Sequence, residues 1–146
     1  HNLKARFYKT VLLEIAVMSN LDVKTTRVLL NNGVSPNEPA GHVYHVGPDR
    51  RTDRPLHFAA AVPDPEMVQV LLSFGANPNA KDAFGRTALH NARSVEIARM
   101  LIEAGADPNA VDAQGSTPLD LAKSPSQAKY LESRGAKRGK KDEKKP

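Results

Sequence analysis

Two stretches of this chain repeat one another at an interval of 30 residues. "GANPNAKDAFGRTALHNA" occupies residues 75–92, and "GADPNAVDAQGSTPLDLA" occupies residues 105–122. Self-similarity at a fixed period is typical of a structural unit stacked on copies of itself. The recurring residues are therefore interpreted first as architecture, before any of them is assigned a chemical role.

A glycine closes each of four apolar segments. The segments read "VLLNNG", "VLLSFG", "MLIEAG" and "YLESRG", and their glycines stand at 33, 75, 105 and 135. Glycine accepts the left-handed conformation in which helices commonly end. The pattern predicts four helices that stop at these glycines.

A second motif lies between successive glycines, as "RPLHFAAA", "RTALHNA" and "STPLDLA". Thr87 and Thr117 occupy an N-cap position, while Pro55 and Pro118 suit a first helical turn, where no backbone N–H is needed. Each unit is therefore predicted to contain a turn, a short helix, a tight loop and a second helix. The short helices carry a small apolar face, made by Leu56, Leu89, Leu119 and the alanines at 59, 60, 92 and 122.

With these motifs the chain resembles an ankyrin-repeat protein. The family signature combines Thr-Pro-Leu-His at the start of a first helix with a Gly-Ala/Ser-Asp-Val-Asn stretch after the second, at a period of about 33 residues. "TALH", "TPLD" and "RPLH" match the first part here, and "GANPNA" and "GADPNA" match the second. The resemblance, which covers about residues 10–136, implies an all-α ankyrin-repeat solenoid of about four helix-turn-helix repeats.

The expected domain spans residues 1–136, and its units lie at about 3–37, 49–81, 82–111 and 112–136. From Thr to Gly the third and fourth units have 18 residues, against 21 from Arg54 to Gly75, so three residues are missing from the first helix or its turn. An insertion at 38–48 extends the first fingertip loop. The first unit lacks the motif and the last one ends in charged residues, as terminal repeats that face water commonly do.

The basic charge of the chain is concentrated at its end. The net charge is +5, and residues 137–146 contribute six Lys or Arg and two acidic residues, so the rest is nearly neutral. With no large apolar residue, this basic tail is predicted to be disordered and solvated. A tether for nucleic acid or an anionic surface is the alternative.

The residues that could carry chemistry are better explained as structure. The absence of cysteine excludes disulfides, thiolate zinc sites and a cysteine nucleophile. The resemblance implies that His57 and His90 hold their own turns, and Asp82 and Asp112 recur where a turn needs an acceptor for backbone N–H groups. His42 and His45 make an incomplete metal set in the inserted loop. We expect no catalytic residue, cofactor or metal site, and therefore no enzyme.

In ankyrin-repeat proteins the variable positions around the turns usually contact a partner, on a concave face formed by fingertips and first helices. Phe84 is the strongest candidate, because an aromatic flanked by cations is typical of interface hot spots; the alternative is packing on the next finger. The inserted loop either enters a partner's cleft or folds over the first unit. The full set of expected partner-binding residues is Val43, Tyr44, His45, Arg50, Arg51, Asp53, Lys81, Phe84, Arg86, Gln114 and Ser116.

The expected function is that of a monomeric, non-catalytic protein-binding module. No apolar run reaches the roughly 18–20 residues of a membrane span, and nucleic acid is not the partner we expect. The compact repeats resemble small bacterial ankyrin proteins, some of which are exported to the periplasm and inhibit a cognate enzyme to protect the producing cell. The start at His1 indicates processing and fits export. A cytoplasmic scaffold or regulator is the alternative.

Overall fold

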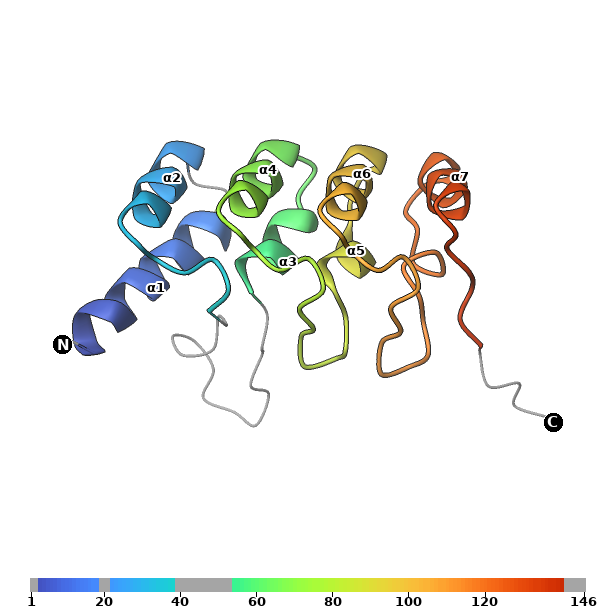
Figure 1. Cartoon of the computed structure of the whole chain (residues 1–146), viewed down its shortest axis with the longest axis horizontal. Helices are drawn as coiled ribbons and strands as arrows, with labels where there is room; N and C mark the ends of the chain where they lie inside the picture. The colour runs from blue at the N-terminus through green and yellow to red at the C-terminus, as the bar shows by residue number, and fades with distance from the viewer. Residues whose placement is uncertain (1–2, 19–21, 39–53, 141–146) are drawn as a thin grey trace.

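The computed structural model describes residues 3–18, 22–38 and 54–140 (Figure 1). Within these ranges the chain forms helices and turns, without a β-strand. The helices are α1 (Leu3–Met18), α2 (Val23–Asn31), α3 (Pro55–Ala60), α4 (Pro65–Ser73), α5 (Ala88–Asn91), α6 (Val95–Glu103) and α7 (Pro125–Ser133).

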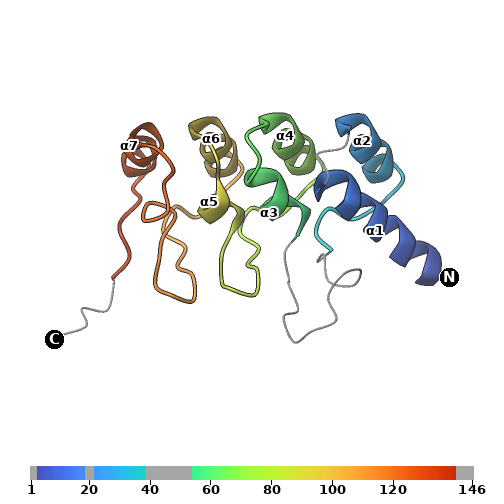
Figure 2. The ribbon, with the colours of Figure 1, turned by 180° about the vertical axis from the view of Figure 1, so that it is seen from behind.

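The helices lie in two rows, an outer row made of α2, α4, α6 and α7 and an inner row made of α1, α3 and α5. Figure 1 shows α2, α4, α6 and α7 side by side along the top, with α1, α3 and α5 beneath them, and the view from behind in Figure 2 shows the same two rows. Helices pack in pairs across the rows, α1 on α2, α3 on α4 and α5 on α6, and each pair packs on the next. The loops after α4 and α6 extend away from both rows as fingers. This arrangement is an all-α solenoid of about four repeats, as predicted.

Each outer helix begins at a side-chain cap. The carboxylate of Asp64 accepts a hydrogen bond from the N–H of Glu66 at the start of α4 (2.9 Å), and the hydroxyl of Ser94 accepts one from Ile97 at the start of α6 (3.2 Å). Asp22 and Ser124 cap α2 and α7 in the same way. Such caps satisfy N–H groups that have no partner within the helix.

Each outer helix also ends at one of the predicted glycines. Gly75 has a φ of 87°, and the next residue, Ala76, donates a 3.0 Å hydrogen bond back to the carbonyl of Leu71. This geometry satisfies a last-turn carbonyl and requires a left-handed residue. The same positive φ recurs at Gly33, Gly105 and Gly135. The four predicted helix stops are therefore confirmed.

Small apolar side chains fill the space between the rows. Leu56, Leu89 and Leu119 are all buried, and their alanine neighbours let the outer helices approach closely. The outer row contributes Leu71, Ile97, Leu101 and Leu131, each completely buried. Burying a side chain of this size contributes about 1.5–3 kcal/mol, so the two rows stabilise one another. The predicted apolar face of the short helices is confirmed.

The inner row shortens along the chain, whereas the outer row does not. The four outer helices have 9 residues each, while α1 has 16, α3 has 6 and α5 has 4. Residues 117–122 form only successive turns, in which Asp120 donates to Thr117 and Leu121 to Pro118. The expectation of a helix beginning at Pro118 is wrong, because the N–H groups of Asp120, Leu121 and Ala122 bond to carbonyls three residues back, as in a 3₁₀ turn. The predicted shortening of the first helix is confirmed.

The start of the basic tail is folded onto the last unit. The hydroxyl of Thr117 donates to the carbonyl of Lys137 (2.7 Å), and the N–H of Gly139 donates to the carboxylate of Asp120 (2.8 Å). Arg138 lies 3.8 Å from the same carboxylate. The prediction of a disordered tail is therefore wrong for residues 137–140, because main-chain hydrogen bonds hold this segment without any apolar side chain.

Two further expectations concern the loop and the membrane. The insertion at 38–48 lies outside the described residues except for Glu38, as do residues 141–146 of the tail. None of the helices described is both long and apolar enough to cross a bilayer.

Candidate partner-binding fingertips

Two fingertips are fully described, the second fingertip at residues 81–86 and the third at 111–116. Each is a tight turn built around one aspartate. In the second, the carboxylate of Asp82 accepts hydrogen bonds from the N–H groups of Phe84 (2.8 Å) and Arg86 (2.9 Å). Asp112 does the same for Gln114 and Ser116, at 2.9 Å each. The interpretation of these aspartates as turn acceptors is confirmed.

The two motif histidines join each turn to the next finger. Nδ1 of His57 accepts from the N–H of Arg54 (3.1 Å), so the ring proton is on Nε2, which donates to the carbonyl of Arg86 (2.9 Å). His90 makes the same pair of bonds, to the N–H of Thr87 and the carbonyl of Ser116. Their structural role is confirmed, and it extends across the boundary between units.

A series of asparagines forms a second set of links between units, which the sequence interpretation missed. The amide of Asn79 donates to the carbonyl of Gly105 (2.8 Å) and accepts from the N–H of Asp107 (2.8 Å). Asn37 and Asn109 repeat this pattern on the units that follow them. The available signal was an Asn four residues after each of the first three helix-stop glycines. Fingers are thus held in register by polar side chains.

Two cations also bridge neighbouring fingers. The guanidinium of Arg54 donates through Nε to the carbonyl of Asn37 and through Nη1 to the carbonyl of Lys81, both at 3.0 Å. The ammonium group of Lys81 donates to the carbonyl of Val111 (3.2 Å). Both cations are therefore engaged by main-chain acceptors of the scaffold.

A hollow of about 210 Å³ lies between the second and third fingertips. The two fingertips are joined by a 2.9 Å hydrogen bond from the N–H of Ala113 to the carbonyl of Phe84. Phe84 nevertheless remains 55% exposed. The residues that line the hollow are Phe84, Arg86, Asp112, Ala113 and Gln114.

The electrostatics of the hollow are set by Arg86 and Asp112. Nε of Arg86 lies 3.5 Å from the Asp112 carboxylate, whose side chain is 1% exposed. Burial raises the pKa of Asp112, but the hydrogen bonds from Ser116, Gln114 and Arg86 outweigh burial and hold it below its usual range. Asp112 is therefore ionised at neutral pH and compensates much of the Arg86 charge.

Three of the expected partner-binding residues meet in this hollow, namely Phe84, Arg86 and Gln114. Lys81 lies on the same fingertip. Ser116 serves the scaffold through its main chain, which bonds to Asp112 and His90. Sequence reasoning treated Asp112 as scaffold alone and missed its pairing with Arg86. The remaining expected residues fall outside the described ranges: Val43, Tyr44, His45, Arg50, Arg51 and Asp53.

The described residues contain no cluster of three His, Cys, Asp or Glu side chains suited to a metal ion. His42 and His45, the pair considered for a metal, lie outside these residues.

Comparison with known proteins agrees with this geometry. Human (Homo sapiens) Rabankyrin-5 is 47% identical over 60 residues, covering 41% of this chain and 5% of that protein. Mouse (Mus musculus) Rabankyrin-5 is 42% identical over 86 residues, which cover 57% of this chain and 7% of that protein. Transient receptor potential cation channel subfamily V member 6 of Rattus norvegicus is 40% identical over 72 residues, which cover 47% of this chain and 9% of that protein. The chain thus matches less than a tenth of the length of these relatives.

The family itself is defined by a broader match. The sequence model of ankyrin repeats, in three copies, matches residues 56–142, which is more than half of the chain. This range contains both described fingertips, the hydrogen-bonded histidines and three of the four glycine-terminated helices. The chain therefore belongs to the ankyrin-repeat family.

Proposed function

We propose that this chain is a non-catalytic module that binds one specific partner protein through its second and third fingertips. Ankyrin repeats are in general protein–protein interaction modules, and the family is generally non-catalytic. A stack of repeats offers an extended surface rather than an enclosed pocket. The proposal therefore concerns which part of that surface binds.

The exposure of Phe84 carries the proposal. Its neighbours in the second fingertip have structural roles. Asp82 closes the turn, Lys81 donates a hydrogen bond to the carbonyl of Val111, and the carbonyl of Arg86 accepts a hydrogen bond from His57. Phe84 is 55% exposed beside a hollow that the next fingertip completes. A large apolar side chain held at the edge of a hollow by a rigid turn is a common form of binding hot spot.

The partner we propose is a cognate enzyme, which the bound module inhibits. Occupation of an active site needs only a rigid, specific surface, and the fingertips supply one through their side-chain and main-chain links. The resemblance of the compact repeats to those of small bacterial ankyrin proteins supports an exported, self-protection role in a bacterium, and we propose the monomer as the active form. A cytoplasmic scaffold or regulator is the alternative, and it would bind its partner without changing catalytic activity.

The test is affinity capture from the source organism with the intact chain and with Phe84→Ala. Val28→Ala is the matched control, because Val28 is an apolar residue of similar exposure (58%) that lies on the outer helix α2. The proposal requires one partner that is retained by the intact chain and by Val28→Ala, and released by Phe84→Ala. Slower turnover of that partner in the complex supports inhibition, and unchanged turnover supports the scaffold. Equal retention by all three forms would mean that the fingertips are not the binding surface.

A further inference from the structure

We infer that the fingertip hollow binds an aspartate or glutamate side chain of the partner protein through Arg86, with an apolar side chain of the partner packed beside it on Phe84. This inference rests on the proposed function and specifies the chemistry of the partner. It is carried by the unequal engagement of three cations in the described fingers, namely Arg54, Lys81 and Arg86.

Of these three cations, Arg86 has the smallest share of its donors engaged by the scaffold. Arg54 uses both Nε and Nη1 on main-chain carbonyls, and Lys81 uses its ammonium group on another. Arg86 uses only Nε, at the long distance of 3.5 Å, and its side chain is 37% exposed. Among the described residues, no acceptor is placed against its two Nη nitrogens. Those nitrogens form the planar pair of donors that suits a carboxylate.

The charge already present in the hollow favours a carboxylate over a phosphate. Asp112 is buried next to Arg86 and is held ionised by the N–H groups of Gln114 and Ser116. A doubly charged phosphate would meet stronger repulsion from this fixed anion than a singly charged carboxylate would. Asp112 also fixes the Nε side of the guanidinium and leaves the Nη side as the side offered to a partner.

The size and lining of the hollow favour side chains of a protein over a free small molecule. At about 210 Å³ the hollow is smaller than the roughly 300–1,000 Å³ typical of small-molecule sites. Phe84 and Ala113 supply an apolar wall, against which an aliphatic or aromatic side chain can pack. The exposed Gln114 adds an amide that can pair with the partner's main chain.

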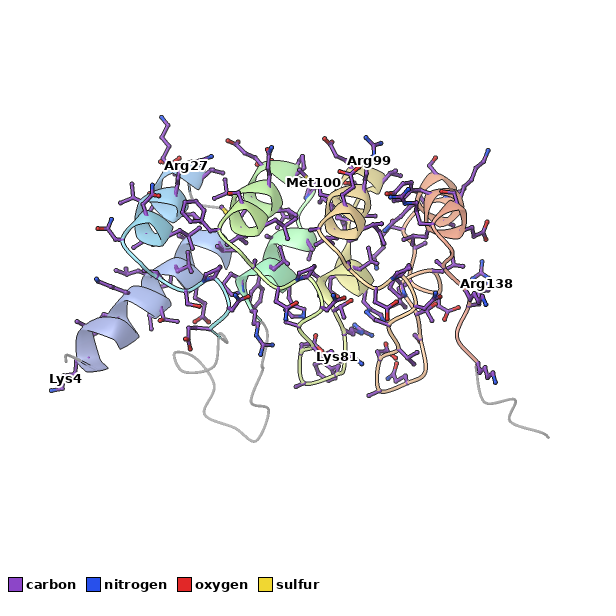
Figure 3. All side chains as sticks on the ribbon, in the orientation of Figure 1. Lys4, Arg27, Lys81, Arg99, Met100 and Arg138 are labelled. Atoms are coloured by element: carbon purple, nitrogen blue, oxygen red, sulfur yellow. The ribbon has the colours of Figure 1, made fainter. Side chains whose placement is uncertain are left out.

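Opposite the fingertips, the outer row offers a matched control. Figure 3 shows Lys81 on the second fingertip and Arg99 on α6, at the far side of the molecule. Arg99 is exposed like a typical surface arginine and lies away from the hollow. Arg99→Gln therefore removes the same charge as Arg86→Gln without touching the proposed contact.

The experiment selects a phage-displayed library of random 12-residue peptides on the full chain. We expect the selected peptides to carry Asp or Glu within two positions of a large apolar residue. Synthetic peptides from the selection are then titrated against the intact chain, Phe84→Ala, Arg86→Gln, Arg86→Lys and Arg99→Gln. Thermal unfolding of each variant checks that it is folded. If Arg86→Gln does not fold, Arg86→Lys still tests the contact.

We expect Arg86→Gln to raise the Kd of such a peptide about tenfold or more, because a charge-assisted pair of hydrogen bonds is lost. Arg86→Lys keeps the charge but not the planar donor pair, and an intermediate Kd is expected. Arg99→Gln should leave the Kd unchanged. Replacing the peptide's acidic residue by its amide should weaken binding to the intact chain as much, and should cost nothing further on Arg86→Gln.

The outcomes separate this inference from the proposed function. Peptides that need Phe84 but show no acidic preference and tolerate Arg86→Gln would overturn the inference and leave the proposed function in place. Peptides that bind to Phe84→Ala and to Arg86→Gln as tightly as to the intact chain, or a selection that yields no binder, would overturn both. An acidic and apolar consensus that depends on Arg86 and not on Arg99 supports both.

Discussion

The side-chain amide of Gln127 donates a 3.0 Å hydrogen bond to the carbonyl oxygen of Ala92, 35 residues earlier in the chain. Its oxygen accepts from the N–H of Lys123 (2.9 Å), and the whole residue is 1% exposed. Ala92 stands where α5 ends early, so its carbonyl lacks a helical partner. One glutamine from the next unit therefore satisfies the main chain that the shortened helix leaves open.

Gln127→Leu is expected to lower the free energy of unfolding by about 1–3 kcal/mol, because the buried carbonyl of Ala92 then has no donor. Gln69→Leu is the control, since Gln69 is exposed on α4 and its replacement should change stability by less than about 0.5 kcal/mol. Urea unfolding of both variants measures the difference. Equal changes for the two would show that the bond to Ala92 contributes no net stability.

The stability of the stack is expected to fall on mild acidification through His90. Burial lowers the pKa of His90 below 6.5, and the hydrogen bond to Ser116 and the charge of Asp112 oppose this only in part. Because folding favours the neutral ring, the contribution of His90 to the stability of the fold is complete above about pH 6.5. This contribution is lost as the pH falls through the folded-state pKa of His90. An NMR titration of the His90 ring should give a midpoint below 6.5. His90→Asn should remove this part of the pH dependence, and a midpoint above 6.5 would contradict the assignment.

A separate loss of stability is expected in acid from Asp112. Burial raises its pKa, but the hydrogen bonds of the third fingertip hold it below 3.8 in the folded chain. Its contribution is therefore present above about pH 3.8 and disappears as the pH falls through the folded-state pKa. Asp112→Asn should cost about 1–3 kcal/mol at pH 7 and progressively less below pH 3.8. Glu96→Gln, at an exposed position on α6, is the control. Urea unfolding of the intact chain and both variants at pH 7 and pH 3 measures this loss. An equal loss of unfolding free energy in Asp112→Asn at the two pH values would contradict the prediction.

Gly139→Ala is expected to detach residues 137–140 from the last unit. A Cβ atom at Gly139 would collide with the carbonyl oxygen of Gly115 and approach the Asp120 carboxylate. The hydrogen bond from Gly139 to Asp120 should then be lost, with about 1 kcal/mol of stability. Faster amide hydrogen exchange at Gly139 and Lys137 measures the detachment, and Lys140→Ala, which leaves the main chain unchanged, should show no such increase. Unchanged protection in Gly139→Ala would mean that the segment tolerates a side chain there.

The outer helices could be predicted because each carries its own signals. Ser94 and Ser124 mark the starts of two of them, and a glycine marks each end, so the boundaries are encoded locally. The turns at 117–122 could not be predicted, because Thr117 and Pro118 have the chemistry of a helix start, and the same deletion in the third unit still leaves the helix α5. The folded part of the tail was also missed. Its contacts at Gly139 are made by the main chain, and they leave no apolar pattern in the sequence.

The candidate site was predictable where it follows the repeat. Phe84 and Gln114 occupy the same position in successive units, so their approach follows from the period of 30 residues. The pairing of Arg86 with Asp112 joins two different positions of the unit, and periodicity alone does not indicate it. The availability of Arg86 also depends on where Arg54 and Lys81 place their donors, which is a property of the folded fingers.

The shrinking inner row gives the stack a polarity. At its start the inner row presents the long helix α1, whereas residues 117–122 present only turns of the main chain. The two ends of the proposed binding face are therefore not interchangeable, although the outer helices behind them have equal lengths. On the proposed binding face this difference would align a partner in one direction, and duplicating a unit would change how the inner row shortens along the stack rather than extend the same surface.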